Sequence, residues 1–190
     1  MIREIVTVGH PVLRAPTRRV TLDELRLTAT QQLIDDLIDT MRDAAGAGIA
    51  ANQIGEGVRI AVIEVAQNTR YPYKPPIPLT VLVNPVLEVV DDEQVIINEG
   101  CLSVPGLRGD LSRTVTVRVR FWDRDGNPHD EIKRGLTAGT FQHECDHLDG
   151  KIFIDRVTDT TTFTTWDNFD RFHRTAFVGR ITEFVNRVGS

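Results

Sequence analysis

Apolar residues recur at helical spacing in two long segments, one near each end of the chain. The first segment begins at the capping box Thr21-Leu22-Asp23-Glu24 and runs to about Ala44. Its apolar positions share one face: Leu25, Leu33, Leu37, Ile38 and Met41. The second segment runs from about Thr165 to Val188, with a stripe of Trp166, Phe169, Phe172, Phe177, Ile181, Phe184 and Val188. Because such stripes are typical of core packing, we predict two amphipathic helices.

Between these helices the apolar residues alternate or form short runs, a pattern typical of β-strands. The predicted strands are residues 58–65, 80–83, 86–90, 95–98, 114–122 and 129–133. Asp125-Gly126 predicts a hairpin turn between the last two. Residues 8–20 should be extended because His10 and Ala15 each precede a proline. A further short extended piece is expected at 152–157.

These elements predict an α+β fold class. We expect short antiparallel strands around a central helix at residues 136–148, which carries the candidate metal ligands His143 and His147 of a His-Glu-x-x-His motif, flanked by an N-terminal and a long C-terminal amphipathic helix. The chain has 190 residues, enough for one domain with a sizeable core, so residues 1–190 are interpreted as a single catalytic domain.

Composition narrows the classes of partner. The net charge of −5, from 22 basic and 27 acidic residues, predicts no direct sequence-specific binding of nucleic acid. No apolar run approaches the length of a membrane span. The first residues show neither a secretory signal nor a transit peptide, so we expect a cytoplasmic protein without a membrane partner. Bacterial cytoplasm and an organelle both remain open.

The candidate chemistry centres on residues 142–147, which contain His-Glu-x-x-His. Residues 136–148 contain no proline, and Gly150 suits a left-handed cap, so a helix is predicted there. On a helix, His143 and His147 lie one turn apart and could bind one metal ion. Glu144 could then act on a water bound to that ion. A solvated helix face with two histidines is the alternative.

Cys101 is a candidate third ligand. It lies at a predicted strand end within Glu99-Gly100-Cys101-Leu102-Ser103. Two histidines, one cysteine and a water would leave an open position, which is typical of catalytic sites. A thiolate also donates charge, which favours a softer ion such as Fe(II). Cys145, two residues after His143, points elsewhere on the helix and is interpreted as a buried small hydrophobe.

Two further segments bear on the site. Residues 46–55 have two interpretations: a helix-to-strand loop, or the rim of a substrate cleft with Gln53 as a donor. Their composition favours the loop. Asp146 adjoins His147 on a helix that must be largely buried, and a buried carboxylate needs a partner. The basic residues nearest to the Cys101 segment are Arg108 and Arg113, and we predict a pair between Asp146 and Arg113.

Three motifs together resemble those of the peptide deformylase family. They are Gly-Ala-Gly-Ile-Ala-Ala-Asn-Gln at 46–53, Glu-Gly-Cys-Leu-Ser at 99–103 and Gln-His-Glu-Cys-Asp-His at 142–147. The resemblance extends from about residue 5 to 157. The proline-rich segment 71–78 and the aromatic C-terminal helix are less general in that family.

The resemblance implies removal of the formyl group from the N-terminal methionine of new proteins. Cys101, His143 and His147 would hold the metal, Fe(II) in the family, with Zn(II), Ni(II) or Co(II) as substitutes. Glu144 would be the general base that acts on water bound to the metal and then delivers a proton to the leaving amine. The partners implied are N-formylmethionyl peptides and the ribosome near the nascent-chain exit.

The resemblance also implies how substrate is held. The formyl oxygen would meet the Gln53 amide and the Leu102 backbone N–H. The peptide backbone would pair with Gly48, Ile49 and the neighbourhood of Gly106. The methionine side chain would enter an apolar pocket formed partly by Ile49 and the metal helix. Arg108 completes the substrate-binding set.

Two rival functions share parts of this pattern. A zincin-type endopeptidase also uses His-Glu-x-x-His, but its third ligand would come from downstream, where the candidates are Asp149, Asp155, Asp159 and His173. That function requires that Cys101 does not bind the metal. A non-catalytic metal-stabilised binding module would need a fourth ligand, Cys145, and its position on the helix opposes this.

Overall fold

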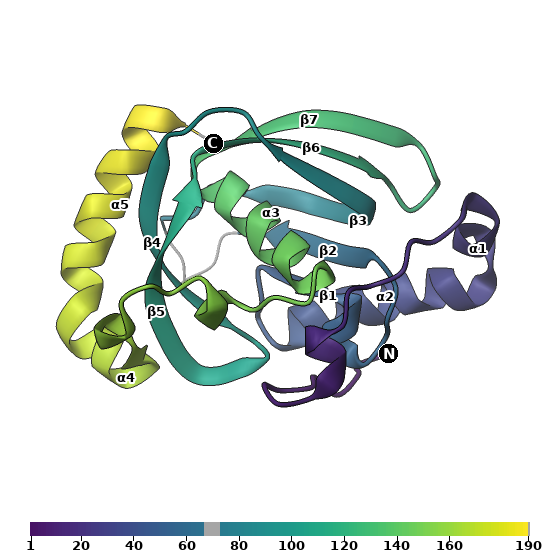
Figure 1. Cartoon of the computed structure of the whole chain (residues 1–190), viewed down its shortest axis with the longest axis horizontal. Coiled ribbons are helices and arrows are strands. Elements are labelled where there is room, and N and C mark those ends of the chain that lie inside the picture. The colour runs from purple at the N-terminus through teal and green to yellow at the C-terminus, as the bar shows by residue number, and fades with distance from the viewer. Residues whose placement is uncertain (67–72, 190) are drawn as a thin grey trace.

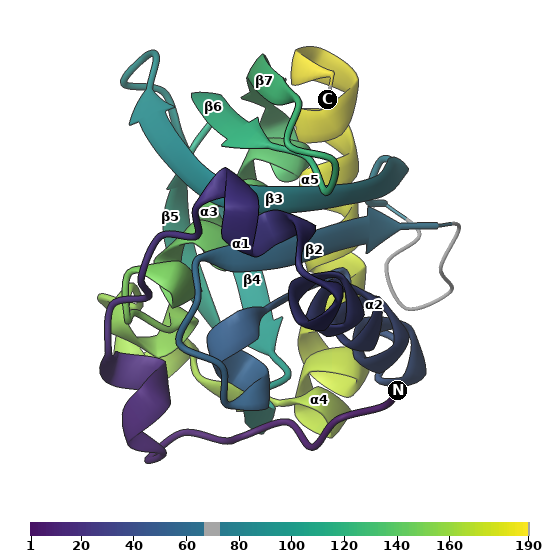
Figure 2. The same cartoon turned by 90° about the vertical axis from the view of Figure 1, so that its right-hand side faces the viewer.

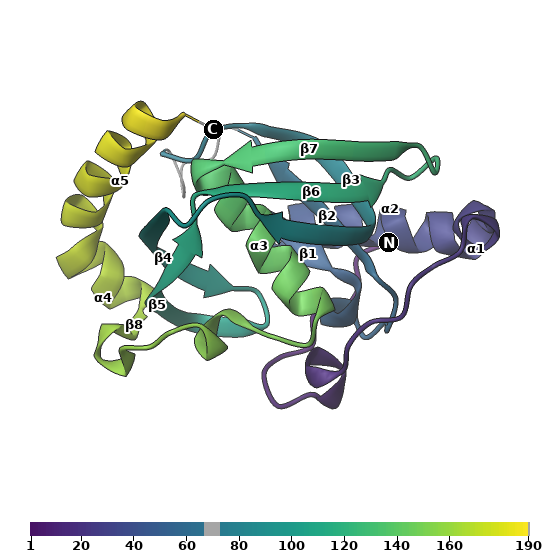
Figure 3. The same cartoon turned by 45° about the horizontal axis from the view of Figure 1, so that its top comes forward.

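A computed structural model describes residues 1–66 and 73–189 of the chain. Its larger sheet has the strand order β1-β2-β3-β6-β7, with all neighbours antiparallel. These strands are β1 (Gly48–Ala50), β2 (Ile60–Val65), β3 (Ile77–Val89), β6 (Thr116–Trp122) and β7 (Pro128–Arg134). The smaller sheet contains β4 (Gln94–Cys101), β5 (Val104–Thr114) and β8 (Thr164–Thr165), again antiparallel (β4 and β5 in Figure 1, β8 in Figure 3). The predicted α+β fold class is confirmed.

Helix α3 (Gly135–Leu148) runs through the middle of this arrangement, between the two sheets (Figure 3). Ala138, Phe141 and Leu148 pack against the apolar face formed by β2, β3 and β6. At its first turn, Leu136 instead joins a cluster with β4 and the C-terminal helix. Burial on nearly every side of α3 explains the glycine near its centre, Gly139. A Cβ atom at Gly139 would lie 3.1 Å from Ile97 Cδ1, so little volume remains there.

The opposite face of the larger sheet is covered by α2 (Thr28–Asp43) (Figure 2). Its apolar side chains pack on strands β1, β2 and β3: Ile34, Leu37, Ile38 and Met41. The predicted continuous helix 21–44 is wrong at Leu27, where the backbone is extended and separates α1 (Leu22–Arg26) from α2. The Gln31 side chain donates to the Leu25 carbonyl at 2.9 Å, which satisfies a group freed by the break. The capping box between Thr21 and Glu24 is present.

The C-terminal helical segment contains α4 (Trp166–Asn168), a π-helical turn η5 (Phe169–His173) and α5 (Arg174–Val188). Phe169, Phe177, Ile181 and Phe184 are buried against β4 and α3, as the stripe predicts. Phe172, which was assigned to the same stripe, is 64% exposed. The wider π turn changes the spacing, so this ring leaves the packed face.

Three strand predictions need correction. Strand β3 does not end at Asn84-Pro85 but continues through a bulge between Val83 and Val86. Asn84 adopts a left-handed φ of 53° there, and its side chain exchanges two hydrogen bonds with the Val20 backbone. Strand β5 was not predicted at all. The strand expected at 114–122 begins only at Thr116, because Thr114 is the last residue of β5.

Short 3₁₀ turns replace two predicted extended pieces. Turn η1 (Pro11–Arg14) interrupts the segment 8–20, and η3 (Phe153–Asp155) lies within 152–157. Two more such turns are η2 (Ala51–Ile54) and η4 (Thr160–Thr162). Of the proline-rich segment, residues 71 and 72 lie outside the described part of the chain. None of the helices in the described ranges is long and apolar enough to cross a membrane.

Candidate metal centre and active site

Three side chains that are far apart in the sequence converge where β4 ends against α3. Cys101 is the last residue of β4, and His143 and His147 lie one helical turn apart on α3. Their candidate ligand atoms all lie within 4.8 Å of one another. Cys101 Sγ is 3.2 Å from His147 Nε2. The structure thus brings together the three metal ligands expected from the sequence.

The sulfur atom of Cys101 is held by polar groups from two elements. Gln53 Nε2, in η2, lies 3.5 Å from Sγ and also donates to Ser103 Oγ at 3.1 Å. The Ser103 backbone N–H points at the same sulfur, at 3.4 Å. Gln53 is itself fixed, because its Oε1 accepts from the Ala50 N–H at 2.9 Å. The N–H groups of Gln53 and Ser103 fix the position of the sulfur beside the two histidines.

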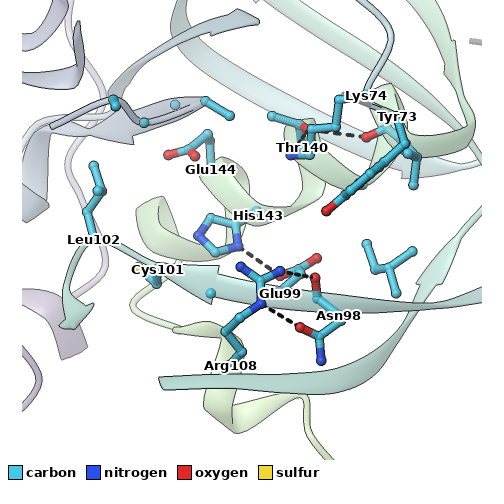
Figure 4. A pocket seen from close by; sticks show the side chains of 18 of the residues that line it. Tyr73, Lys74, Asn98, Glu99, Cys101, Leu102, Arg108, Thr140, His143 and Glu144 are labelled. Carbon is cyan, nitrogen blue, oxygen red and sulfur yellow. Dashed lines mark hydrogen bonds and ion pairs between the residues drawn. The ribbon is translucent and has the colours of Figure 1, made fainter. Parts of the chain in front are cut away.

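His143 is oriented by a buried carboxylate. Its Nδ1 lies 2.8 Å from Glu99 Oε2, which leaves Nε2 for the ligand cluster (Figure 4). Glu99 also receives two hydrogen bonds from Arg113, at 2.8 and 2.9 Å. Burial alone would raise the pKa of Glu99, but Arg113 and His143 outweigh it and hold that pKa well below its usual range.

Arg113 continues the network to Asp146. Its Nη1 lies 2.6 Å from Asp146 Oδ2, and both side chains are nearly inaccessible to solvent. The predicted pair between Asp146 and Arg113 is therefore confirmed. Arg156, which the sequence did not suggest, pairs with Asp146 from the other side at 2.5 Å. A chain of ion pairs from Arg156 to His143 therefore ties β4, β5 and α3 together behind the ligands.

Glu144 points into the pocket beside the ligands (Figure 4). The residue is only 3% exposed, and its Oε2 has no hydrogen-bond partner within the described ranges. A Cβ atom at Gly48 would lie 2.7 Å from the Glu144 carboxyl carbon, so glycine lets β1 approach this carboxylate. Burial raises the pKa of Glu144 to about 7. An unpartnered buried carboxylate suits a group that takes up and releases a proton.

The residues present fit one metal ion. One sulfur and two imidazole nitrogens form a donor set typical of Zn(II) or Fe(II). Cys145 is not part of this cluster. It lines a groove on another side of α3 with Arg59 and Asp149, and burial raises its pKa to about 12. Among the described residues, the downstream candidates Asp149, Asp155, Asp159 and His173 do not join the cluster either.

The remaining predicted site residues fall into two groups. Gly48, Gln53, Leu102 and Arg108 line the same pocket as Cys101, His143 and Glu144. The side chain of Ile49 is fully buried in the core under α2, and it does not form part of the pocket. Gly106 is exposed near the start of β5, outside the pocket lining.

Sequence reasoning missed several residues of this pocket. Tyr73 and Lys74 enter it from the segment before β3, and Trp166 and Phe177 enter from the C-terminal helical segment. Trp166 and Phe169 stack on the guanidinium of Arg108, whose carbon lies 4.0 and 4.7 Å from their ring centroids. The aromatic stripe was assigned to core packing, and nothing in its spacing distinguishes a residue that also faces a pocket.

Comparisons with known proteins agree with this geometry. Residues 2–163 match the model of the family described as polypeptide deformylase. A peptide deformylase of Leptospira biflexa is 37% identical over 170 residues, covering 89% of this chain and 95% of that protein. Peptide deformylase 2 of Ralstonia nicotianae is 44% identical over 166 residues, covering 86% and 91%.

A solved structure also has the same fold. The class I type b peptide deformylase of Acinetobacter baumannii with bound Met-Ala-Ser has a TM-score of 0.78 and 33% identity. The match covers 83% of this chain and 99% of the Acinetobacter baumannii chain. The sequence match, the shared fold and the convergence of Cys101, His143 and His147 lead to one conclusion: this chain belongs to the polypeptide deformylase family.

Proposed function

We propose that this chain removes the formyl group from the N-terminal methionine of newly made polypeptides. The observation that carries the proposal is the Glu144 carboxylate, which is buried and unpartnered at Oε2 among the described residues. It lies in the pocket lined by Cys101 and His143, two of the three candidate ligands. A relative of the same fold binds Met-Ala-Ser, a peptide of the kind that such a reaction releases.

Cys101, His143 and His147 would hold the metal ion, and we infer Fe(II) as the native ion, with Zn(II), Ni(II) or Co(II) able to replace it. When bound, a divalent ion supplies Lewis acidity to a carbonyl and lowers the pKa of water. Glu99 would keep the His143 ring in one tautomer through Nδ1. The N–H groups of Gln53 and Ser103 would hold the Cys101 sulfur in position beside the ion.

The side chains around the ligands divide the remaining tasks. Glu144 takes a proton from the attacking water and delivers it to the departing amine. Gln53 Nε2 and the Leu102 backbone N–H would donate to the formyl oxygen as negative charge develops there. Gln53 already lies 3.5 Å from the Cys101 sulfur, so its amide is close to the reacting centre before substrate arrives.

The peptide would extend a sheet edge. Within the described chain β1 pairs only with β2, so its other edge remains open for an incoming strand. Gly48 and the backbone of Ile49 would pair with the substrate there. Gly106 and Arg108, both on β5, would contact residues further along the peptide. Figure 4 shows Arg108 across the pocket from Glu144, which allows the peptide to pass between them.

The methionine side chain would enter the part of the pocket beyond His143, between the apolar residues Ile97, Leu136 and Phe177. Since Phe177 lies on α5, the C-terminal helix contributes to this pocket, and we propose that the whole chain acts as one catalytic domain. We further propose that it works in the cytoplasm on nascent chains near the ribosomal exit.

Formate release from formyl-Met-Ala-Ser tests this function. Enzyme loaded anaerobically with Fe(II) should release formate and free Met-Ala-Ser in equal amounts. Unformylated Met-Ala-Ser and an internal peptide should remain intact. Cleavage of internal peptide bonds without formate release would contradict the proposal and favour an endopeptidase.

A further inference from the structure

Lys74 places an ammonium group in the wall of the pocket that the proposed function assigns to the substrate. It lies just before β3, is partly buried and lines the pocket together with Tyr73. Figure 4 shows both residues on the opposite side of the pocket from Cys101 and Leu102, with His143 between. A side chain that starts at the metal ligands and passes His143 would therefore end near Lys74.

The ammonium is held in place by α3. Lys74 Nζ donates to Thr140 Oγ1 at 3.3 Å, and Thr140 in turn donates to the Leu136 carbonyl at 3.2 Å. Burial lowers the pKa of Lys74, while the charges of Glu99 and Glu144 oppose that shift. The chain contains only three lysines, at 74, 133 and 151, against nineteen arginines. The lysine ammonium is a compact point charge with three N–H donors on a flexible stem.

The rest of this part of the pocket is apolar. Ile97, Leu136 and Phe177 belong to one buried cluster, and the Tyr73 ring packs edge-on against Phe177 at 5.3 Å between centroids. In such surroundings a polar substrate atom that finds no partner pays the full desolvation cost. A positive charge and N–H donors at the end of the pocket offset that cost for a hydrogen-bond acceptor.

We propose that Lys74, positioned by Thr140, makes this pocket selective for a first residue whose side chain ends in a hydrogen-bond acceptor. The chain therefore deformylates N-formyl-methionine sulfoxide peptides in preference to their norleucine counterparts, and methionine falls between the two. The inference rests on the proposed function and deepens it. The sulfoxide oxygen is a strong acceptor, the thioether sulfur is a weak one, and norleucine has the length of methionine with no acceptor.

Three substrates test the inference: formyl-Met(O)-Ala-Ser, formyl-Met-Ala-Ser and formyl-Nle-Ala-Ser. The wild-type chain should show a higher kcat/KM for the sulfoxide than for norleucine. Lys74→Met keeps the apolar stem and removes the charge. The ratio of sulfoxide to norleucine should then fall by about tenfold to a hundredfold, the range for a lost hydrogen bond to a charged group. Thr140→Val removes the acceptor that positions Lys74 and should shift the ratio in the same direction, by less.

The controls separate selectivity from damage to the fold. Lys151→Met changes an exposed lysine and should leave all three constants unchanged. Lys74→Arg restores the charge and should retain more of the preference than Lys74→Met. The norleucine peptide reports on folding and metal loading within each variant, because its turnover does not need the ammonium.

Two outcomes would overturn the inference while the proposed function stands. One is a wild-type chain that prefers norleucine to the sulfoxide. The other is a Lys74→Met chain in which all three constants change by the same factor, since Lys74 would then only obstruct or support the pocket. A chain that releases formate from none of the three peptides contradicts the proposed function itself, and this inference with it.

Discussion

Nδ1 of His143 lies 2.8 Å from a carboxylate oxygen of Glu99, and the same carboxylate is bound by Arg113. The contact fixes which nitrogen of His143 is turned toward Cys101. It also keeps a negative charge directly behind a ligand, which makes the imidazole a stronger donor. The ligand cluster therefore depends on a residue that holds no metal itself.

Glu99→Gln should weaken metal binding by about 10–100-fold, because the neutral amide cannot replace the charge and leaves Arg113 less well compensated. The measurement is competition with a chelator for Zn(II) or Ni(II). Glu88→Gln is the matched control, since Glu88 also pairs with an arginine but is exposed and away from the site. Equal metal affinities of the two variants would contradict the role given to Glu99.

The local chemistry of the site could be predicted from the sequence, since it is encoded by short motifs. His143, Glu144 and His147 lie on one helical segment, where spacing alone fixes which side chains share a face. Cys101 could be predicted as a ligand only from a second motif, because sequence spacing does not show where that motif lies relative to the helix. Arg113 could be predicted because a buried carboxylate at Asp146 demands a cation, and the basic residues nearest to the Cys101 segment are only Arg108 and Arg113.

Other features could not be predicted, because tertiary packing decides them. Residues 104–114 contain a proline, two glycines and several charges without apolar alternation, so they do not resemble a strand. Pairing with β4 along its length forms β5 nevertheless. Arg108 is fully buried within β5, stacked under Trp166. Lys74 reaches the pocket only through the path of the chain before β3, of which the sequence carries no local signal.

Breaking the pair between Arg113 and Asp146 should strongly destabilise the fold. Asp146→Asn leaves Arg113 buried with one charged partner fewer, and we expect a loss of about 3–5 kcal/mol in the free energy of unfolding. Arg118→Gln, which breaks the exposed pair with Asp130, should cost much less, because solvent screens that pair. Urea unfolding of both variants without metal measures the difference. Similar losses in the two variants would show that the buried ion-pair network contributes no more to the free energy of unfolding than an exposed pair.

Cys101→Ala should lose most of its metal at ordinary chelator concentrations, because it removes the only sulfur of the donor set. Cys145→Ala should keep one equivalent, since that thiol lies outside the cluster and its pKa is raised to about 12 by burial. Metal content after dialysis against chelator measures both. Retention of one equivalent by both variants would remove Cys101 from the ligands.

Glu144→Gln should keep its metal and its fold but lose at least about 10²–10⁴-fold in activity, as expected for a general base. Turnover of formyl-Met-Ala-Ser, with metal content measured on the same sample, tests this. A tenfold loss or less would exclude Glu144 as the base.

The pH profile gives a second test of the same role. A base works only when deprotonated, so kcat/KM should rise with pH and level off above the pKa of Glu144. Burial raises that pKa to about 7, and the positive charge of a bound ion lowers it again, so the midpoint should lie at or below about 7. A profile whose rise has its midpoint well above about pH 7, or that falls as the pH rises toward about 7, would contradict this assignment.

The identity of the metal should decide both how fast the chain works and how long it lasts in air. The Cys101 thiolate donates more charge than a carboxylate or a third imidazole, which lowers the Lewis acidity of the ion it binds. Zn(II) held by one thiolate and two imidazoles favours four-coordination and should accept the formyl oxygen reluctantly. Fe(II) accepts a fifth ligand more readily. The Fe(II) form should therefore be fast from the start and the Zn(II) form slow.

The same ligand explains the expected loss of activity in air. Cys101 is partly exposed, and oxygen can convert an iron-bound thiolate to sulfenic and then sulfinic acid, which no longer holds the ion. Metal-free chain reloaded with Fe(II), Ni(II) or Zn(II) should be assayed fresh and after aerobic incubation, with mass spectrometry of the Cys101 peptide. The Fe(II) form should decay while the Ni(II) and Zn(II) forms persist. A Zn(II) form as fast as the Fe(II) form, or an Fe(II) form indifferent to air, would show that the thiolate does not set these properties.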